Sequence, residues 1–558
     1  MRKSRITISF AAFIAFAALC ASPVFSFDVS PTQSKAVVSK KKQVVSSKKL
    51  LSEIVSDDSL RSNIEMLVLT DGGERLSSLR GNLSEPFSGN METAARDYVL
   101  NNSKLFNLPA STLNSGNDFL KTVRNEQING VSHISFAWNI DGVNVYNALI
   151  EIHIGKNGVV QLANGSFPTI KEVANSVSIS STEALEAAKS AASLKTLRGK
   201  ARSELTLFCE SEKARWAYVV KIPASDPLGD WEILIDAETR HEISRLNQMR
   251  FAFREGLEAE GVGSVYVNHP SAGPVENVKL YHLTSNTLKG EYANVVNEDT
   301  PSGISETHEH IYDPNDTHFD EANVYFYISN IHDYFWSLGF RRMEFPMTAI
   351  VHYGTNYDNA GFSMWEEALI FGDGAVKFFD LAKEETVTYH EYGHAHLAEI
   401  VSLNYSAESG AMDEGQADYF ACSLSNDPKL GEYVCGKSGK PWLRNLTDKL
   451  HYPEDIKNEV HQDGKIWGAT LWDLRISLGA KITDQLVENS LYYLKNGGPT
   501  FIDGYNSIME ADRETFGGAH SDTITKIFNN RGILKAHAEE VFTPSDLKTM
   551  ATFNLLYK

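Results

Sequence analysis

The chain has 558 residues, of which 42% are hydrophobic and 22% are charged, and its formal net charge is -20 at pH 7. Its length exceeds that of one ordinary domain, and its composition is that of a soluble globular protein. The negative charge argues against nucleic acid as a main partner, because phosphate groups are bound by basic surfaces.

The N-terminal segment, residues 1–26, has the pattern of a secretory signal peptide. Three basic residues among the first five precede an apolar run over 6–20, and Ser26 closes a small-residue pattern. This arrangement is typical of a segment that is removed during export. We therefore expect a secreted protein, with the periplasm, the cell surface and the extracellular medium as alternative destinations. No other segment reaches about 18 uninterrupted apolar residues, so no membrane span is expected in the mature chain.

The first half of the chain alternates between hairpin and helix patterns. Asp141-Gly142 and Asn157-Gly158 lie between apolar runs and predict β-hairpins. The stretch 181–194 has a Ser/Thr start and predicts a helix, which is followed by two further strand patterns. These elements favour small α+β modules.

The second half changes from strands to helices. After a polar stretch at 247–261, strand-like alternation returns over 262–283. Residues 319–340 predict a long amphipathic helix with aromatic side chains on its apolar face. Beyond residue 385 the pattern is mostly helical. The sequence thus predicts an α+β protein with a β-rich part before a helical part.

Three cysteines, Cys209, Cys422 and Cys435, remain if Cys20 is removed with the signal peptide. Export permits disulfides, and Cys422 and Cys435 are close enough in sequence to pair, which would leave Cys209 unpaired. The alternative is three buried free thiols.

The stretch 388–399, "TYHEYGHAHLAE", concentrates residues that bind metal. His390 and His394 are four positions apart, so an α-helix presents both on one face. Neutral imidazoles suit zinc, and Glu391 stands where a general base for a metal-bound water is needed. By itself this short pattern also fits an exposed, histidine-rich helix face.

A catalytic zinc requires a third protein ligand and an open fourth position. In "ESGAMDEGQADYF", Glu414 can ligate, and Asp418 on the same helix face can accept a hydrogen bond from the far nitrogen of a ligating histidine. The alternative is an ordinary acidic first turn of a helix.

Taken together, these features resemble the thermolysin-like zinc metallopeptidases. Glu414 and Asp418 follow His390 by 24 and 28 positions, and "LNYSAESGAMDEGQAD" resembles that family without a gap. The segment "HEYGHAH" looks closer still to the related fungalysin group. The resemblance implies one zinc ion per chain held by His390, His394 and Glu414. It also implies that Glu391 is the general base and that Asp418 orients a zinc ligand.

The resemblance extends on both sides of the metal motif. "VHYGTNYDNAGF" resembles the edge strand that pairs with the substrate backbone, which places Asn359 and Ala360 in substrate binding. "PWLRNLTD" places Arg444 on the arginine that orients the substrate carbonyl. "EVHQDGKIWGATLWDL" places His461 on the histidine that stabilises the oxyanion together with Tyr405. The alternatives are a surface arginine and a helix-capping histidine.

The sequence departs from thermolysin at its calcium cluster. The positions that match its calcium-binding carboxylates fall near Thr386, Ser425, Tyr433 and Cys435, and none of these is acidic. We therefore expect no calcium at this place, while binding elsewhere stays open. Our hypothesis is that a disulfide between Cys422 and Cys435 ties down the segment instead.

Two further departures concern the cleft. Gly361 stands where thermolysin has an aromatic residue, so the cleft is expected to differ in shape. Ile456 stands at the position of the acid that partners His461, so either Asp455 or Glu459 is expected to take that role.

The resemblance implies a secreted zinc endopeptidase that acts on proteins and peptides and is made as a zymogen with its own inhibitory pro-region. The expected organisation is a signal peptide at 1–26, a pro-region of small α+β modules at 27–250, a β-rich lobe at 251–385 and a helical lobe at 386–558. The expected fold is the α+β, two-lobe thermolysin-like fold. The alternatives are a zinc exopeptidase and a secreted binding protein with a relic site.

Overall fold

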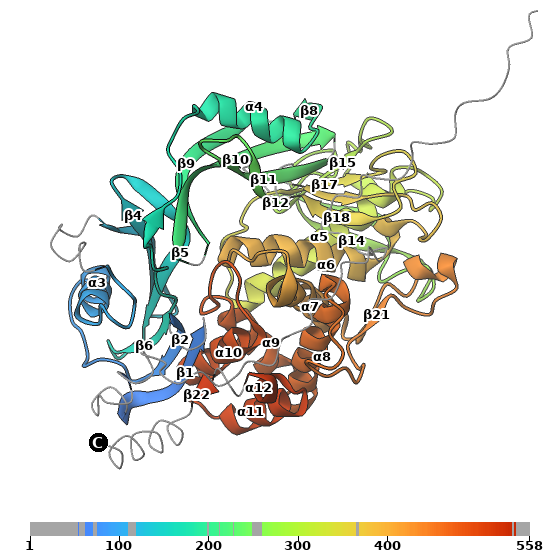
Figure 1. The fold of residues 1–558 in the computed structure, drawn as a ribbon. Helices are drawn as coiled ribbons and strands as arrows, with labels where there is room; N and C mark the ends of the chain where they lie inside the picture. The colour runs from blue at the N-terminus through green and yellow to red at the C-terminus, as the bar shows by residue number, and fades with distance from the viewer. Residues whose placement is uncertain are drawn as a thin grey trace, which may run out of the picture.

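A computed structural model describes residues 54, 62–70, 75–109, 119–197, 200–210, 212–226, 228–247, 259–363, 368–537 and 541–542. The predicted signal peptide and the end of the predicted pro-region, residues 248–250, lie outside these ranges. Within them the chain has a β-rich N-terminal half and a helical C-terminal half (Figure 1). None of the described helices is long and apolar enough to cross a membrane.

The N-terminal half is built on one long sheet of 13 strands. Its first module contains β1 (Ile64–Thr70), β2 (Arg75–Gly81), α3 (Met91–Asn101), β3 (Leu120–Ile128), β4 (Val131–Ile140), β5 (Val143–Ile154) and β6 (Val160–Asn164). The β4–β5 hairpin turns at Asp141 and Gly142, whose φ angles of 50° and 89° suit a tight turn, so the predicted hairpin is confirmed. Strand β1 also pairs antiparallel with β22 (Val541–Phe542), far along the chain.

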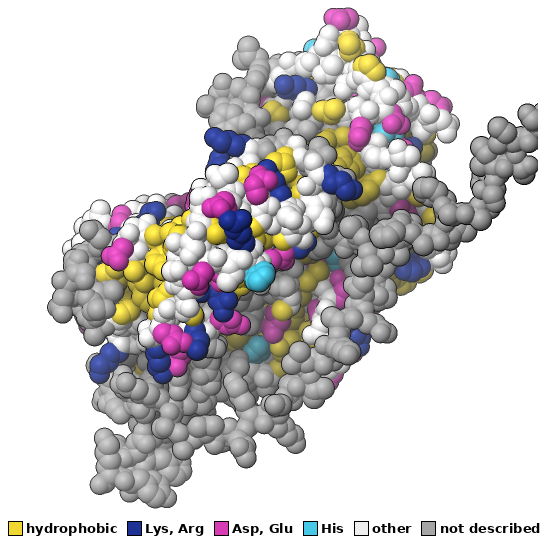
Figure 2. All heavy atoms as spheres, turned by 45° about the horizontal axis from the view of Figure 1, so that its top comes forward, with side chains coloured by type: hydrophobic (Ala, Val, Ile, Leu, Met, Phe, Trp, Pro, Cys, Tyr) yellow, Lys and Arg dark blue, Asp and Glu magenta, His cyan; other side chains and the backbone are white. Residues whose placement is uncertain are grey.

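A second module continues the sheet. It contains β7 (Glu172–Val173), α4 (Ser181–Ala191), β8 (Thr196–Leu197), β9 (Arg202–Glu210), β10 (Lys213–Asp226), β11 (Leu228–Asp236) and β12 (Glu242–Asn247). Helix α4 begins with a capping box between Ser180 and Glu183, as its Ser/Thr start predicts. Its Ala184 and Ala188 are fully buried in the module's core. Figure 2 shows positive and negative side chains interspersed over the face that is turned forward.

The next part of the chain forms two smaller sheets and a long helix. They contain β13 (Ala259–Tyr266), β14 (Val275–Leu283), β15 (Ala293–Asn297), β16 (Glu309–His310), α5 (Phe319–Leu338), β17 (Met347–Val351), β18 (Ala360–Ser363) and β19 (Ala368–Phe371). The predicted long helix is α5, and Gly339 ends it with a φ of 103°. Strand β18 lies at one end of the four-stranded sheet β15-β17-β19-β18. The position of β18 leaves one side of it without a strand partner among the described residues.

The helical half follows. It contains η3 (Leu381–Lys383), α6 (Glu385–Ile400), α7 (Ala407–Ser425), β20 (Lys429–Leu430), η4 (Val434–Ser438), β21 (Arg444–Asn445), α8 (Val460–Leu478), α9 (Ala480–Ser490), α10 (Phe501–Phe516), α11 (Ser521–Asn530) and α12 (Ile533–Ala536). Helix α7 packs between α6 and α8 at very close range. A Cβ atom on Gly393 of α6 would lie 3.1 Å from Cα of Ala417, and one on Gly415 of α7 would lie 2.4 Å from the carbonyl oxygen of Gly464. These glycines let α7 approach both neighbours, which brings Glu414 beside the histidines of α6. Together the two parts confirm the α+β, two-lobe arrangement that the resemblance implies.

The disulfide hypothesis is wrong. Cys422 and Cys435 are both buried and both free, and Cys209 is free as well. The segment around residue 434 is held by Glu384, which directly precedes α6. Its buried carboxylate accepts hydrogen bonds from the backbone N–H groups of Tyr433 (3.0 Å) and Val434 (2.7 Å).

Replacing Glu384 by Ala is expected to lower the free energy of unfolding by about 3 kcal/mol, because the buried backbone N–H of Val434 and the half-buried one of Tyr433 lose their acceptor at about 1–3 kcal/mol each. Thermal and denaturant unfolding would measure the change. Glu432→Ala is the control, since its carboxylate pairs with the half-exposed Lys429 on the surface, and its effect should stay within about 1 kcal/mol. Equal stability of the Glu384→Ala and wild-type proteins would contradict this role of Glu384.

Candidate metal centre

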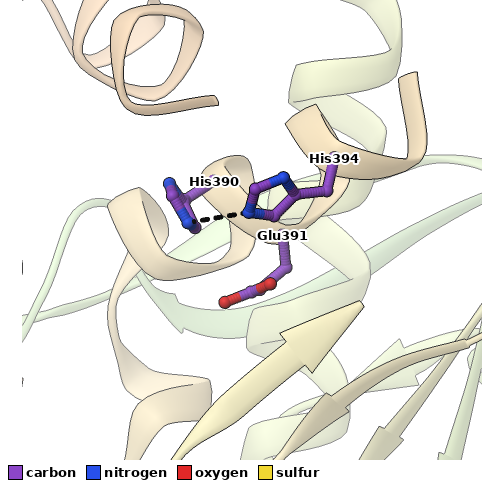
Figure 3. Close-up of side chains that lie close together, drawn as sticks. All are labelled: His390, Glu391 and His394. Carbon is purple, nitrogen blue, oxygen red and sulfur yellow. Dashed lines mark hydrogen bonds between the residues drawn. The ribbon is translucent and has the colours of Figure 1, made fainter. Parts of the chain in front are cut away.

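The centre is built on helix α6, which carries His390, Glu391 and His394 (Figure 3). All three are buried, and each offers a ligand atom within 4.8 Å of those of the others. The Nε2 atoms of His390 and His394 point toward each other, 3.1 Å apart. The spacing of four residues therefore places both rings at one point, as the sequence predicts.

Glu414 reaches the same point from helix α7. Its Oε2 lies 3.4 Å from Nε2 of His390, and its Oε1 lies 3.6 Å from Nε2 of His394. In a tetrahedral zinc site with bonds of about 2.0 Å, neighbouring ligand atoms lie about 3.3 Å apart. The three side chains therefore fit a zinc ion with one coordination position left for a further ligand.

Glu391 extends below the two rings, where the side of α6 faces a strand (Figure 3). Both of its carboxylate oxygens are buried, and neither has a hydrogen-bond partner among the described residues. Burying a carboxylate in this way is costly unless another group completes the site. Burial raises the pKa of Glu391, which favours proton uptake. An acceptor of this kind suits a general base.

The Nδ1 atom of each histidine, on the side of the ring away from the shared point, contacts a carboxylate. Asp418 lies 2.9 Å from Nδ1 of His390, as predicted, and Asp413 lies 2.7 Å from Nδ1 of His394. Burial acts to lower the pKa of His390, but hydrogen bonds to Asp418 and Glu414 raise it to about 9. Asp413 was not predicted from the sequence, because it lacks the helical spacing that marks Asp418 and looks like an ordinary acidic residue beside Glu414.

Replacing Asp413 by Ala is expected to weaken zinc binding about 10- to 100-fold, because the ring of His394 loses the acceptor that fixes its tautomer and orientation. Competition with a chromophoric chelator would measure the affinity. Asp413→Asn keeps an acceptor and should lose less, and the exposed Asp522→Ala should lose nothing. Unchanged affinity in Asp413→Ala would show that His394 needs no such support.

Arg444 lies on β21 and is almost fully buried. Its Nε and Nη2 donate to both oxygens of Asp418 at 2.7 Å each. Its Nη2 is 3.9 Å from Oε2 of Glu414. Arg444 is therefore not a surface arginine, and it lies beside the proposed metal ligands.

Tyr405 and His461 meet on the other side of Glu414. The Tyr405 hydroxyl donates to Oε1 of Glu414 and lies 3.4 Å from Nε2 of His461. The partner acid of His461 is Glu459, whose Oε1 lies 2.7 Å from Nδ1. Burial acts to lower the pKa of His461, but the Glu414 and Glu459 carboxylates raise it. The ring can therefore act as a donor. Asp455, the other expected partner, instead accepts from the backbone N–H of His451.

Asn359 and Ala360 lie where the edge strand begins. Ala360 is the first residue of β18 and pairs with Phe371 of β19, while the carbonyl oxygen of Asn359 accepts from Gly372. Helix α6 packs against β18. The strand therefore runs along the helix that carries the metal centre.

The third histidine of the stretch 388–399 has a different role. His396 is fully buried, and its Nε2 lies 2.7 Å from Oε2 of Glu488 on α9. Its ring stacks on Phe335 of α5 at a centroid distance of 3.6 Å. His396 thus joins α6 to α9 and α5 and takes no part in the metal centre.

Comparison with known proteins gives three family matches. Residues 349–536 match the fungalysin metallopeptidases (M36), residues 261–397 match the catalytic domain of the thermolysin metallopeptidases, and residues 120–167 match the fungalysin/thermolysin propeptide motif. The propeptide match covers strands β3 to β6.

Relatives that align over about three quarters of this chain agree with these matches. A zinc metalloproteinase of Listeria monocytogenes is 25% identical over 72% of this chain and 86% of its own length. A bacillolysin of Bacillus amyloliquefaciens is 24% identical over 72% of this chain and 83% of its own. An extracellular elastase of Staphylococcus epidermidis is 22% identical over 75% and 87%.

Proposed function

We propose that this chain, which is a zinc metallopeptidase of the thermolysin and fungalysin type, is a secreted endopeptidase whose reaction is carried by Glu391, Tyr405, His461 and Arg444 around a zinc held by His390, His394 and Glu414. The observation that carries the proposal is the buried Glu391 carboxylate beside three ligand atoms whose separations fit one tetrahedral zinc ion. Structural support alone gives no reason to bury that carboxylate without a hydrogen-bond partner among the described residues.

The zinc ion, when bound, supplies a Lewis acid that polarises the scissile carbonyl and lowers the pKa of a coordinated water to about 7. Glu391 takes the proton of the attacking water and delivers it to the leaving amine. Tyr405 and His461 donate hydrogen bonds to the carbonyl oxygen as it gains negative charge, each such donor contributing about 3 kcal/mol. Asp418 holds both His390 and Arg444, and Arg444 orients the substrate.

The substrate backbone is proposed to lie along β18, where Asn359 and Ala360 stand at the start of an edge strand. An extended peptide can add to such an edge through main-chain hydrogen bonds. This mode of binding recognises internal stretches of protein chains and does not require a free end.

The proposed precursor has a signal peptide at 1–26, an inhibitory pro-region at 27–250, a β-rich lobe at 251–385 and a helical lobe at 386–558. The propeptide motif at 120–167 and the export pattern of the first 26 residues support this organisation. The sheets before residue 385 and the helices after it support the division into two lobes.

The test uses the processed protein, a peptide blocked at both ends and a count of bound zinc. We expect about one zinc per chain, cleavage of internal bonds, loss of cleavage on zinc removal and recovery when zinc is returned. Blocked ends separate an endopeptidase from an exopeptidase, which would leave this peptide intact. Bound zinc without cleavage of any peptide would overturn the proposal in favour of a relic site.

A further inference from the structure

The N-terminal half meets the helical half at the segment between α9 and α10, residues 492–497. The side chain of Asn164 on β6 donates to the carbonyl oxygen of Tyr493 at 3.3 Å, and Lys495 donates to Ser77 on β2 at 2.9 Å. This contact belongs to the proposed pro-region on one side and to the proposed helical lobe on the other.

At this surface, both carboxylate oxygens of Glu151 on β5 contact Asn496. Glu151 is only 2% exposed. Its Oε1 accepts from the side-chain amide of Asn496 at 2.5 Å, and its Oε2 accepts from the backbone N–H of Asn496 at 3.2 Å. A buried carboxylate depends on such donors, so this pair holds Asn496 in one orientation.

The same asparagine holds the loop that follows α6. The side-chain oxygen of Asn496 accepts from the backbone N–H of Ser402 at 2.7 Å. Gly497 then exchanges backbone hydrogen bonds with that loop, donating to the carbonyl oxygen of Ser402 at 2.6 Å and accepting from Asn404 at 2.7 Å. Residues 402–404 are therefore shaped by Asn496 and Gly497.

Tyr405 comes directly after these residues. Its hydroxyl contacts the zinc ligand Glu414 and lies 3.4 Å from His461. A shift of the 402–404 backbone therefore moves the hydroxyl that is to donate to the reacting oxygen. A displacement of about 1 Å can cost about 100-fold in rate.

We propose that Asn496 is a positioning residue for Tyr405, and that Glu151 of the pro-region couples pro-region docking to the placement of Tyr405 through it. The inference rests on the proposed function, because it takes Tyr405 as an oxyanion donor. It identifies a direct path of contacts from the pro-region into the catalytic centre: Glu151, Asn496, the 402–404 loop and Tyr405.

The first experiment measures the processed enzyme. Asn496→Ala should lower kcat about 10- to 100-fold with KM changed less than about threefold, because an oxyanion donor is misplaced while the substrate-binding strand is intact. Asn496→Asp should recover most of kcat, since its carboxylate still accepts from Ser402. The exposed Asn530→Ala is the control and should behave as wild type. An unchanged kcat in Asn496→Ala, or a loss that falls on KM alone, would overturn the positioning role.

The second experiment uses the full chain with Glu391→Gln, so that it neither cleaves itself nor depends on activity. Hydrogen exchange at the backbone N–H groups of Ser402 and Asn404 is the readout. Adding Asn496→Asp places two carboxylates face to face, so exchange should become at least about tenfold faster. Adding Glu151→Gln as well restores a donor–acceptor pair and should return exchange to the starting level.

Exchange that stays within twofold in all these chains would overturn the coupling. Exchange that rises with Asn496→Asp but is not restored by Glu151→Gln would also overturn it, because the effect would then be internal to the helical half. If the processed wild type cleaves no peptide, the proposed function fails, whereas the exchange experiment still decides whether docking and the Tyr405 loop are coupled.

Discussion

Replacing Glu391 by Gln is expected to lower kcat about 10³-fold, within the range of about 10²–10⁴ for general acid–base catalysis. Glutamine has nearly the same shape but cannot take the proton of the attacking water. Zinc should remain bound at the wild-type level, because its proposed ligands are His390, His394 and Glu414. Steady-state kinetics and metal analysis on the same preparation would measure both quantities.

Glu399→Gln is the matched control, since it makes the same change on the same helix at a half-buried position. Its kcat should stay within about threefold of wild type, as surface substitutions usually have small effects. A Glu391→Gln enzyme that keeps more than a tenth of kcat would contradict the role of Glu391 as the base. Loss of zinc from this variant would instead make Glu391 a ligand.

Acidification from pH 7 to pH 5 is expected to loosen the contact between the N-terminal and helical halves by about 25-fold through His153, with His133 acting in the same direction. His133 on β4 and His153 on β5 are directly opposite each other, and their Nδ1 atoms lie 2.9 Å apart. Both rings are buried against Tyr493 of the helical half, at centroid distances of 5.1 and 5.6 Å. Two protonated rings cannot make this contact, because both nitrogens would then be donors.

The contact weakens on acidification because both histidine pKa values are shifted downward. Burial lowers the pKa of His133 well below its ordinary value, and it lowers that of His153 to about 3, with Arg124 acting in the same direction on both. The contact between the N-terminal and helical halves is therefore fully stable above the ordinary histidine pKa of about 6.5. It weakens as the pH falls below that value. The charged groups around the pair are Arg124, Glu126 and Arg342, with Glu151 on β5, Lys156 and Glu514 on α10 nearby.

Hydrogen exchange in the Glu391→Gln chain, corrected for the intrinsic effect of pH, would measure this loosening at residues 131–135 and 492–497. His133→Gln with His153→Gln should flatten the pH dependence, and the exposed His241→Gln should leave it intact. Equal protection at pH 5 and pH 7 in the wild-type pair would show that the histidines do not control docking.

The parts of the centre that could be predicted from the sequence are those set by local geometry. His390 and His394 follow from helical spacing, whereas Glu414 was assigned from the family resemblance, because the α6–α7 packing that brings it to them is not local. The turn at Asp141-Gly142 and the capped start of α4 are also local, and both were predicted correctly. In both cases a short stretch favours its own conformation through local geometry and capping.

What could not be predicted depends on which elements meet in space. Glu459, and not Asp455, partners His461, because Glu459 caps helix α8 and stands over the ring. The wrong disulfide has the same origin. Cys422 and Cys435 are close in sequence, but the segment is held by Glu384, whose hydrogen bonds run to residues 49 and 50 positions away. Neither residue spacing nor composition predicts such long-range contacts.

The pairing of β1 with β22 affects when the sheet can be completed during synthesis of the chain. Val68 lies opposite Val541, so the first strand of the sheet finds this neighbour only after almost the whole chain has been made. At about 5–20 residues per second the ribosome needs roughly half a minute or more to reach it. The N-terminal half, although synthesised first, therefore completes its sheet last, when the helical half is already available to receive it.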